Sequence, residues 1–132
     1  MTESTATVAQ LYIDAMASDE PGALPALFAD DIVWHQPGAN RFSGVKHGSG
    51  AVGAMIGAMM AVSGGTFALQ STGAPMVNGD LAALPIRFSA RREGAEMSMD
   101  GVDLLRVRDG RVAEAWLFSA DQAAEDAFWG QG

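Results

Sequence analysis

The stretch Met97-Ser98-Met99-Asp100-Gly101-Val102-Asp103-Leu104-Leu105-Arg106-Val107 decides the fold, because side chains of alternating character are typical of a strand with one buried face. One face carries Met97, Met99, Gly101, Asp103, Leu105 and Val107. The other face carries Ser98, Asp100, Val102, Leu104, Arg106 and Arg108. The first face is apolar except for Asp103, whereas the second is mixed. We therefore predict a long, half-buried strand with one carboxyl group on its buried face.

Turn signals on both sides extend this strand into an antiparallel meander. Asp109-Gly110 and Glu93-Gly94 are turn sequences, and Asn78-Gly79 is typical of a tight hairpin. The strands predicted between these turns are residues 66–72, 76–77, 81–91, 96–107 and 111–119. The second half of the chain is therefore expected to form one sheet, followed by a helical tail over 121–129.

The first half of the chain is expected to supply three helices. The first has apolar residues at helical spacing and could be capped by Thr2, Ser4 or Thr5; its stripe is Val8, Leu11, Tyr12, Ala15 and Met16. A break at residues 19–22 leads to a short second helix that begins near Pro21, ends at Asp30-Asp31 and carries Ala23, Leu24, Leu27 and Phe28. The third covers residues 49–62, with Val52, Met55, Ile56, Met59 and Met60 on one side.

A short strand pair is predicted between the second and third helices. Residues 32–36 are β-branched and aromatic and end before Pro37-Gly38, and residues 41–43 are expected to return as a partner strand. Together these elements predict an α+β fold, a cone-shaped barrel with three N-terminal helices packed in a strongly curved, mainly antiparallel sheet. We expect one domain over residues 1–132.

Composition excludes several classes of protein. The 132 residues are 48% apolar and 18% charged, and the net charge of −8 with a single lysine, Lys46, does not favour nucleic acid or an anionic membrane as partner. There are no cysteines, which excludes disulfides and thiolate metal sites. With no signal peptide visible after Met1, we expect a cytoplasmic protein that needs no cofactor.

Asp103 is the first candidate for chemistry. A buried carboxyl group must be paired, hydrogen-bonded or protonated, and a protonated acid can donate a hydrogen bond to a ligand oxygen. The alternatives are that Asp103 caps a turn, pairs with an arginine, or is turned to the other face by a bulge.

Two other groups are candidates for the same site. Tyr12 lies on the buried side of the first helix, where its hydroxyl needs a partner, and His35 lies on a strand, where it could act as a base or face solvent. His47 is expected in a loop, and two isolated histidines do not predict a metal site. As candidate substrate-binding residues we name Trp34, Gln36, Met55, Met59, Met99, Trp116 and Phe118.

Several short segments resemble one known family. They are Phe28–Asp31, Trp34–Gly38, Gly64–Phe67, Val107–Val112 and Asp126–Trp129. In their order and spacing they resemble the SnoaL-like and ketosteroid-isomerase-like branch of the nuclear transport factor 2-like superfamily, over nearly the whole chain. The resemblance implies the cone fold described above, and it implies a homodimer that pairs through the sheet.

The resemblance also implies roles for three residues. Ketosteroid isomerases combine an aspartate base with a tyrosine and a protonated aspartic acid that bind the substrate oxygen. Tyr12 and Asp103 match the two hydrogen-bond donors, whereas Gln36 stands where the family has its base, and an amide cannot accept a proton at neutral pH.

Three hypotheses for the function follow. The first is an isomerase, cyclase or dehydratase acting on an apolar, polyketide-like or steroid-like carbonyl compound, with His35 as the candidate base and Gln36 orienting substrate or water. The second is a binding module for a small hydrophobic ligand. The third is a Tyr12–Asp103 pair that serves only the core, in a protein that acts through its dimer surface.

Overall fold

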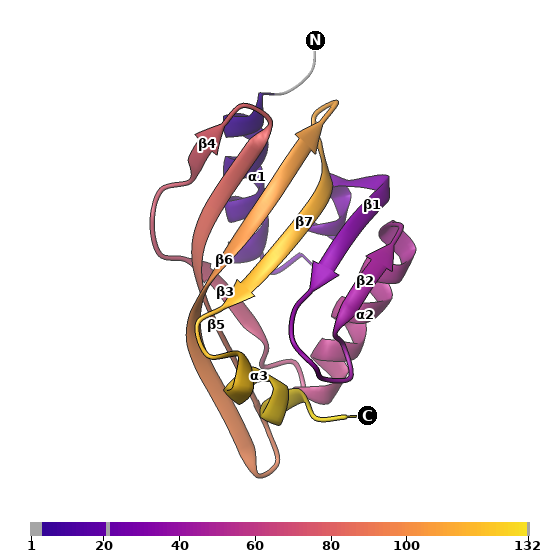
Figure 1. Ribbon diagram of the computed structural model, residues 1–132, viewed down its shortest axis with the longest axis vertical. Coiled ribbons are helices and arrows are strands. Elements are labelled where there is room, and N and C mark those ends of the chain that lie inside the picture. Colours follow the sequence, from indigo (N-terminus) through magenta and orange to yellow (C-terminus); the bar gives the residue numbers. More distant parts are fainter. Residues whose placement is uncertain (1–3, 21, 132) are drawn as a thin grey trace.

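The computed structural model describes residues 4–20 and 22–131 and contains three α-helices, one 3-10 turn and seven strands (Figure 1). In chain order these are α1 (Thr5–Ala17), η1 (Pro25–Leu27), β1 (Phe28–Gln36), β2 (Gly44–His47), α2 (Ser49–Val62), β3 (Ala68–Ser71), β4 (Met76–Asn78), β5 (Leu81–Arg92), β6 (Ala95–Arg108), β7 (Arg111–Ser119) and α3 (Gln122–Trp129). The α+β class is therefore confirmed.

All seven strands form one curved sheet. Its order is β2-β1-β7-β6-β5-β3, with β4 paired to β5 beside β3. Every neighbouring pair is antiparallel except β1 and β7, which run parallel and so end at the same edge of the sheet. β5 and β6 are the longest strands, and they pair from Leu81–Arg106 to Arg92–Ala95 in a long antiparallel hairpin (Figure 1).

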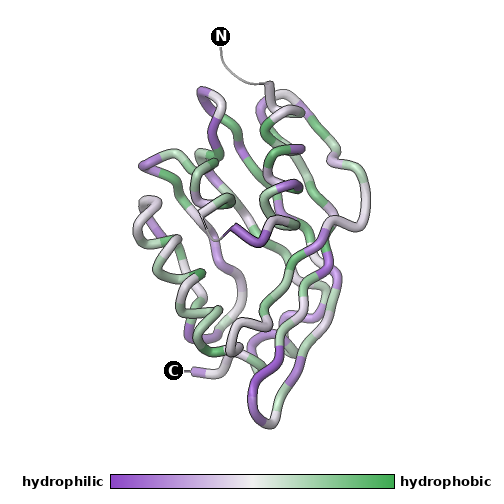
Figure 2. Tube along the Cα trace, turned by 180° about the vertical axis from the view of Figure 1, so that it is seen from behind, coloured by the Kyte–Doolittle hydropathy of each residue, from purple (hydrophilic) through white to green (hydrophobic). Residues whose placement is uncertain are grey.

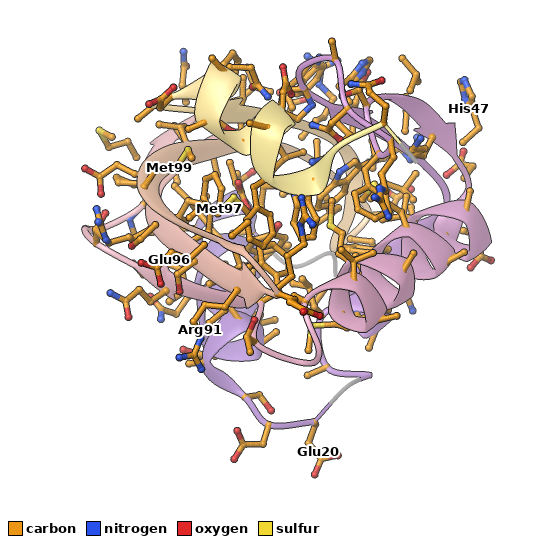
Figure 3. All side chains as sticks on the ribbon, turned by 90° about the horizontal axis from the view of Figure 1, so that it is seen from below. Glu20, His47, Arg91, Glu96, Met97 and Met99 are labelled. Carbon is orange, nitrogen blue, oxygen red and sulfur yellow. The ribbon has the colours of Figure 1, made fainter. Side chains whose placement is uncertain are left out.

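The helices enclose the concave face of this sheet. Viewed from behind, α1 and α2 lie over the same side of the strands, and α2 carries no charged residue (Figure 2). Seen from below, α3 lies across the lower end of the barrel (Figure 3). None of the helices in the described segments is long and apolar enough to cross a membrane.

The strand that decided the prediction alternates as expected. In β6 the side chains of Met97, Met99, Asp103, Leu105 and Val107 are buried, and those of the opposite face are exposed or half-buried. The hairpin at Asn78-Gly79 is also confirmed, since Asn78 pairs with Leu81 across the turn. Ser4 caps α1, accepting a hydrogen bond of 3.1 Å from the Thr7 amide.

The predicted second helix is wrong. Only the 3-10 turn Pro25–Leu27 forms there, because Pro25 lacks an amide hydrogen in the middle of the expected helix and Phe28 already pairs with Val112 of β7. The two proposed features at Thr2 and Pro21 lie outside the described residues. The third α-helix is instead the C-terminal one.

The predicted partner strand at 41–43 instead begins after a turn, at Gly44. Asn40 accepts a hydrogen bond from the Phe42 amide and its carbonyl accepts one from the Ser43 amide, so these residues form a turn. Pairing with β1 begins at Gly44 and ends at His47, which is therefore a strand residue and not a loop residue. Figure 3 shows the His47 side chain at the outer edge of the molecule.

The apolar C-terminal tail is covered by the domain itself. Trp129 is fully buried, and the ring of each aromatic neighbour meets it edge-on, with centroid distances of 4.9 Å to Phe128, 5.1 Å to Phe42 and 5.7 Å to Phe67. These contacts hold α3 against the turn between β1 and β2, which carries Phe42, and against the loop after α2, which carries Phe67. A second subunit is not needed to bury this tail.

We expect Gly101→Ala and Gly57→Ala to change stability in opposite directions. A methyl group on Gly101 would lie 2.5 Å from the Phe118 carbonyl oxygen and 3.0 Å from the Phe88 ring, so the substitution should lower the free energy of unfolding by about 1–3 kcal/mol. Gly57 is exposed on α2 with open space around it, so alanine there should raise that free energy by about 0.5–1 kcal/mol. Urea denaturation of both variants measures the two effects, and equal stability of the parent and Gly101→Ala would contradict the packing described at β6.

Candidate active site

A cavity with an open mouth lies between the concave face of the sheet and helices α1, α2 and α3. Its volume is about 160 Å³, and most of its wall is apolar. The apolar wall includes Met55, Ile56, Met59, Ile86, Phe88 and Leu117. Two of the candidate substrate-binding residues, Met55 and Met59, are therefore part of the cavity wall. Unbranched methionines give this wall an adaptable shape.

Tyr12 and Asp103 meet at the inner end of this cavity. The Tyr12 hydroxyl, from α1, donates a hydrogen bond of 2.9 Å to Oδ2 of Asp103, from β6. Tyr12 is fully buried and Asp103 is 3% exposed. Of the alternatives for Asp103, a turn cap, an arginine pair and a bulge that turns it outward are all excluded by this geometry.

Burial sets the protonation of both groups. It raises the pKa of Asp103 to about 7, although the hydrogen bond from Tyr12 acts in the opposite direction. Burial, together with the neighbouring charge of Asp103 and the hydrogen bond to it, raises the pKa of Tyr12 well above its ordinary value. Tyr12 therefore keeps its proton, and Asp103 changes between acid and carboxylate near neutral pH.

The second oxygen of Asp103 faces the cavity. Within the described segments, Oδ2 of Asp103 has Tyr12 as its hydrogen-bond partner, and Oδ1 has no partner. In the same segments, every fully buried side-chain oxygen or nitrogen has a partner, so Oδ1 is not fully buried. Oδ1 is therefore reachable from the cavity that Asp103 lines. Because the Tyr12 hydrogen is already used on Asp103, the proton of the acid form is the donor left for a ligand.

Gln36 lies on the same row of the sheet as Asp103. The β1–β7 register runs to His35–Trp116, so Gln36, the next residue of β1, is level with Leu117, and Leu117 pairs with Asp103 across β6 and β7. Two strand spacings, about 10 Å, therefore separate Gln36 from Asp103. The Gln36 amide oxygen accepts a hydrogen bond of 2.9 Å from the Trp34 indole, and both residues line the cavity as expected.

His35 does not reach the cavity. β1 pairs with β7 without a register shift from Val33 to His35, so His35 points to the outer face, where its Nε2 lies 2.7 Å from Glu114 and its ring stacks on Trp116 at 5.3 Å. This placement contradicts His35 as a base in this cavity.

Three other proposed binding residues divide in the same way. Trp116 lies on the outer face with His35, and Met99 is buried in the core without lining the cavity. Phe118 lines the cavity mouth and is 54% exposed. The expectation that Met99 and Trp116 contact a ligand in this cavity is therefore corrected.

Sequence reasoning missed a second polar group, at the mouth of the cavity. Glu125 of α3 is 4% exposed and lines the cavity together with Ser119, the last residue of β7. Its Oε1 accepts hydrogen bonds from Ser119 (2.6 Å) and Gln122 (3.1 Å), and its Oε2 accepts one from the Trp129 indole (3.2 Å). Glu125 shares a helix face with the apolar Phe128 and Trp129, and that spacing shows from the sequence only that a carboxylate lies on the buried face of this helix.

α3 is also fastened to the turn after β1. Oδ1 of Asp126 accepts hydrogen bonds from the Ala39 amide (3.1 Å), the Asn40 side chain (2.8 Å) and Gln122 (3.0 Å). Burial acts to raise the pKa of Asp126, but these three donors outweigh it and lower the pKa below its usual value. The helix that carries Glu125 is therefore held over the cavity by a second carboxylate.

Metal binding has no support in the described parts of the chain. Across 4–20 and 22–131, the structure contains no cluster of three or more His, Asp or Glu side chains that could hold an ion. The polar side chains that line the cavity are two carboxyl groups, a phenol, a serine hydroxyl and an amide.

Comparisons with known proteins give the family. Residues 9–115 match the SnoaL-like domain. A Xanthomonas campestris protein of unknown function with a cystatin-like fold is 43% identical, with a TM-score of 0.91 over 98% of this chain and 100% of that one. Bal32a, from a soil-derived mobile gene cassette, is 26% identical, with a TM-score of 0.86 over 95% of both chains.

More distant similarity reaches proteins described by an activity. A putative polyketide cyclase from Sinorhizobium meliloti is 24% identical, with a TM-score of 0.61 over 83% of this chain and 92% of that one, which shows a shared fold. No curated protein matches the chain. The cone fold, the residues that match and the 43% identical relative agree, and the chain belongs to the SnoaL-like family.

Proposed function

We propose that this protein binds a small, mostly apolar carbonyl compound in its cavity and acts on it by acid–base chemistry, as an isomerase, cyclase or dehydratase. The observation that carries the proposal is the Tyr12–Asp103 pair, which is buried in an apolar wall with one Asp103 oxygen facing the cavity. An acid in that position donates a hydrogen bond to a ligand oxygen and stabilises the negative charge that develops when a neighbouring carbon loses a proton. This chemistry needs no cofactor.

The size of the cavity limits the ligand. Pockets for drug-sized molecules have volumes of roughly 300–1,000 Å³, whereas a cavity of about 150 Å³ holds benzene. At about 160 Å³, this cavity fits one ring, with any further part of the ligand leaving past Phe118 and the mouth. The volume favours a monocyclic carbonyl compound over the steroid-like ligand expected from the family resemblance.

Gln36 favours a second candidate, a binding module without turnover. The position that holds the aspartate base in the resembling isomerases carries an amide, which orients a ligand but does not remove a proton. Under this alternative the same ligand class would bind through Asp103 and leave unchanged.

The outer face of the sheet supports the proposal of a homodimer. Val45, Val102 and Phe118 are 50%, 36% and 54% exposed, and Val102 and Phe118 are cross-strand partners. Apolar side chains gathered on one sheet face mark interaction surfaces. A two-fold pairing of this face would cover them.

The first prediction concerns ligand binding and pH. We expect 2-cyclohexen-1-one, a one-ring ketone, to quench Trp34 fluorescence on binding, with an affinity that falls about tenfold for each pH unit above 7, because only the acid form of Asp103 can donate to the ketone oxygen. Asp103→Leu should bind at least tenfold more weakly at pH 6. Asp103→Asn is the matched control: its amide donates at every pH, so its affinity should not vary between pH 6 and 9. A wild-type affinity that is constant over this range would contradict the proposed donor.

The second prediction concerns stability and pH. Because the folded-state pKa of Asp103 is about 7 and the ordinary value is 3.8, the folded protein holds this proton more tightly than the unfolded chain. The contribution of Asp103 to stability is therefore present below pH 4 and is lost as pH rises to about 7. Relative to the parent, Asp103→Asn should gain up to about 4 kcal/mol between pH 4 and pH 8, from about three pKa units at 1.4 kcal/mol each. Urea denaturation at both pH values measures this difference, with Asp100→Asn on the opposite face of β6 as the control for loss of a carboxylate.

The third prediction concerns the dimer. Sedimentation equilibrium should give twice the mass of one chain for the parent and the mass of one chain for Val102→Asp, because a charge at the centre of the apolar face opposes burial. Leu11→Asp changes an exposed apolar residue on α1, which covers the opposite face of the sheet, and should remain a dimer. A parent that sediments as a monomer at micromolar concentration would refute the pairing.

A further inference from the structure

The cavity has a carboxyl group at each end, in contrasting surroundings. Asp103 receives one hydrogen bond, from Tyr12, and otherwise lies among apolar side chains. Glu125 of α3 receives three hydrogen bonds, from Ser119, Gln122 and Trp129, and lies at the mouth beside the end of β7. Three donors around Glu125 suit an ionised carboxylate, whereas the apolar surroundings of Asp103 suit an acid.

We infer that Glu125 is the general base of this site and accepts the proton that Gln36, in the family's base position, cannot accept. The inference rests on the proposed function, since it assigns a role in the same reaction. It is carried by the position of Glu125 in the cavity wall and by its hydrogen bonds, as follows.

Glu125 retains the capacity to accept a proton. An ionised carboxylate offers about four lone-pair sites. Ser119 and Gln122 occupy the two on Oε1, and Trp129 occupies one on Oε2. One site on Oε2 is therefore free, on a side chain that lines the cavity.

The distance between the two carboxyl groups fits a single ring. Asp103 pairs with Leu117, and Ser119 is the next inward residue along β7, which makes it the diagonal neighbour of Asp103 at about 7–8 Å. The Glu125 carboxylate lies 2.6 Å beyond the Ser119 hydroxyl. A monocyclic ketone that gives its oxygen to Asp103 would thus present the carbons of its ring to Glu125.

The resulting step balances. The Glu125 carboxylate takes a proton from a carbon next to the carbonyl group, and the electron pair of that C–H bond forms a C=C bond. The carbonyl π electrons move to oxygen, where the Asp103 proton stabilises the enolate. If the Glu125 acid first exchanges its proton with solvent, reprotonation of the same carbon exchanges hydrogen; delivery of the proton to the far carbon of a conjugated enolate isomerises the ketone.

Two structural features keep Glu125 in place for this role. Asp126, the next residue, fastens α3 to Ala39 and Asn40, and Trp129 packs among three other aromatic rings. The base is therefore carried on an element that packing holds rigid, which general-base catalysis requires.

The test is hydrogen–deuterium exchange at the α-carbons of cyclohexanone in D₂O, followed by proton NMR. We expect the wild-type protein to accelerate exchange and Glu125→Gln to lose that acceleration by a factor of about 10²–10⁴, the usual contribution of a general base. Binding of 2-cyclohexen-1-one to Glu125→Gln should stay within about threefold, because the ketone oxygen contacts Asp103. Glu114→Gln, a carboxylate on the outer face of β7, is the matched control and should exchange at the wild-type rate.

A double variant separates a base from a structural residue. Adding Gln36→Asp to Glu125→Gln puts a carboxylate in the family's base position, and we expect it to restore exchange without restoring the hydrogen bonds of Glu125. If Glu125→Gln does not fold, Ser119→Ala takes its place. It leaves the carboxylate with one donor fewer, and we expect exchange to become about two- to fivefold faster, since a second lone pair is then free to accept the substrate proton.

The outcomes distinguish this inference from the proposed function. Unchanged exchange in Glu125→Gln, or no change in Ser119→Ala, overturns Glu125 as the base. Exchange that is absent in the wild type but present in Gln36→Asp also overturns it, while supporting the Asp103 donor. If neither the wild type nor Gln36→Asp exchanges and the ketone does not bind, the proposed function fails, and the inference fails with it.

Discussion

The burial of one carboxyl group on the concave face of β6 is the constraint on which the site depends. An unpartnered charge there would cost too much free energy. Asp103 therefore needs a hydrogen-bond donor when it is ionised, and it must be able to take up a proton. Tyr12 of α1 supplies this donor, with its hydroxyl 2.9 Å from Oδ2 of Asp103. The hydrogen bond so joins α1 to β6, the third strand from the β3 edge of the sheet. The hydrogen bond therefore does two things: it fixes where α1 lies across the sheet, and it leaves one oxygen of Asp103 facing the cavity.

Closure of the cavity follows from the curvature of the sheet and from two helices of different character. α2 faces the cavity with methionines and presents glycines and alanines outward, so the wall that it forms is adaptable. α3 has the opposite character, with a buried carboxylate and a buried indole joined by a hydrogen bond. An adaptable side wall accepts ligand rings of different shapes, and a fixed mouth keeps the reacting carbon of the ligand in one position.

The sequence predicted the sheet better than the segments that connect its first strand. Alternation over 97–107 and turn pairs such as Asn78-Gly79 predict strands from local information, and both were confirmed. The segment around Pro25 misled because its apolar spacing is helical, whereas its structure is decided by pairing with Val112, far along the chain. For the site, Tyr12 and Asp103 follow from burial patterns, but Glu125 becomes visible only once α3 is known to cross the cavity mouth. Its sequence neighbours say only that a carboxylate lies on an apolar helix face.

His35 and Glu125 together illustrate why a base is difficult to assign from a family resemblance. A regular strand sends successive side chains to opposite faces, so His35, next to the position of the missing base, is as far from the cavity as the thickness of the sheet allows. Glu125 is 89 residues from Gln36 along the chain, yet it reaches the same cavity because β1 and β7 are parallel and end together. In this fold the end of β1 and the helix after β7 are neighbouring places from which a carboxylate can face one ligand. A change of base from one place to the other would leave Asp103 and the oxygen it binds unchanged, so the chemistry can persist while the residue at the family's base position does not.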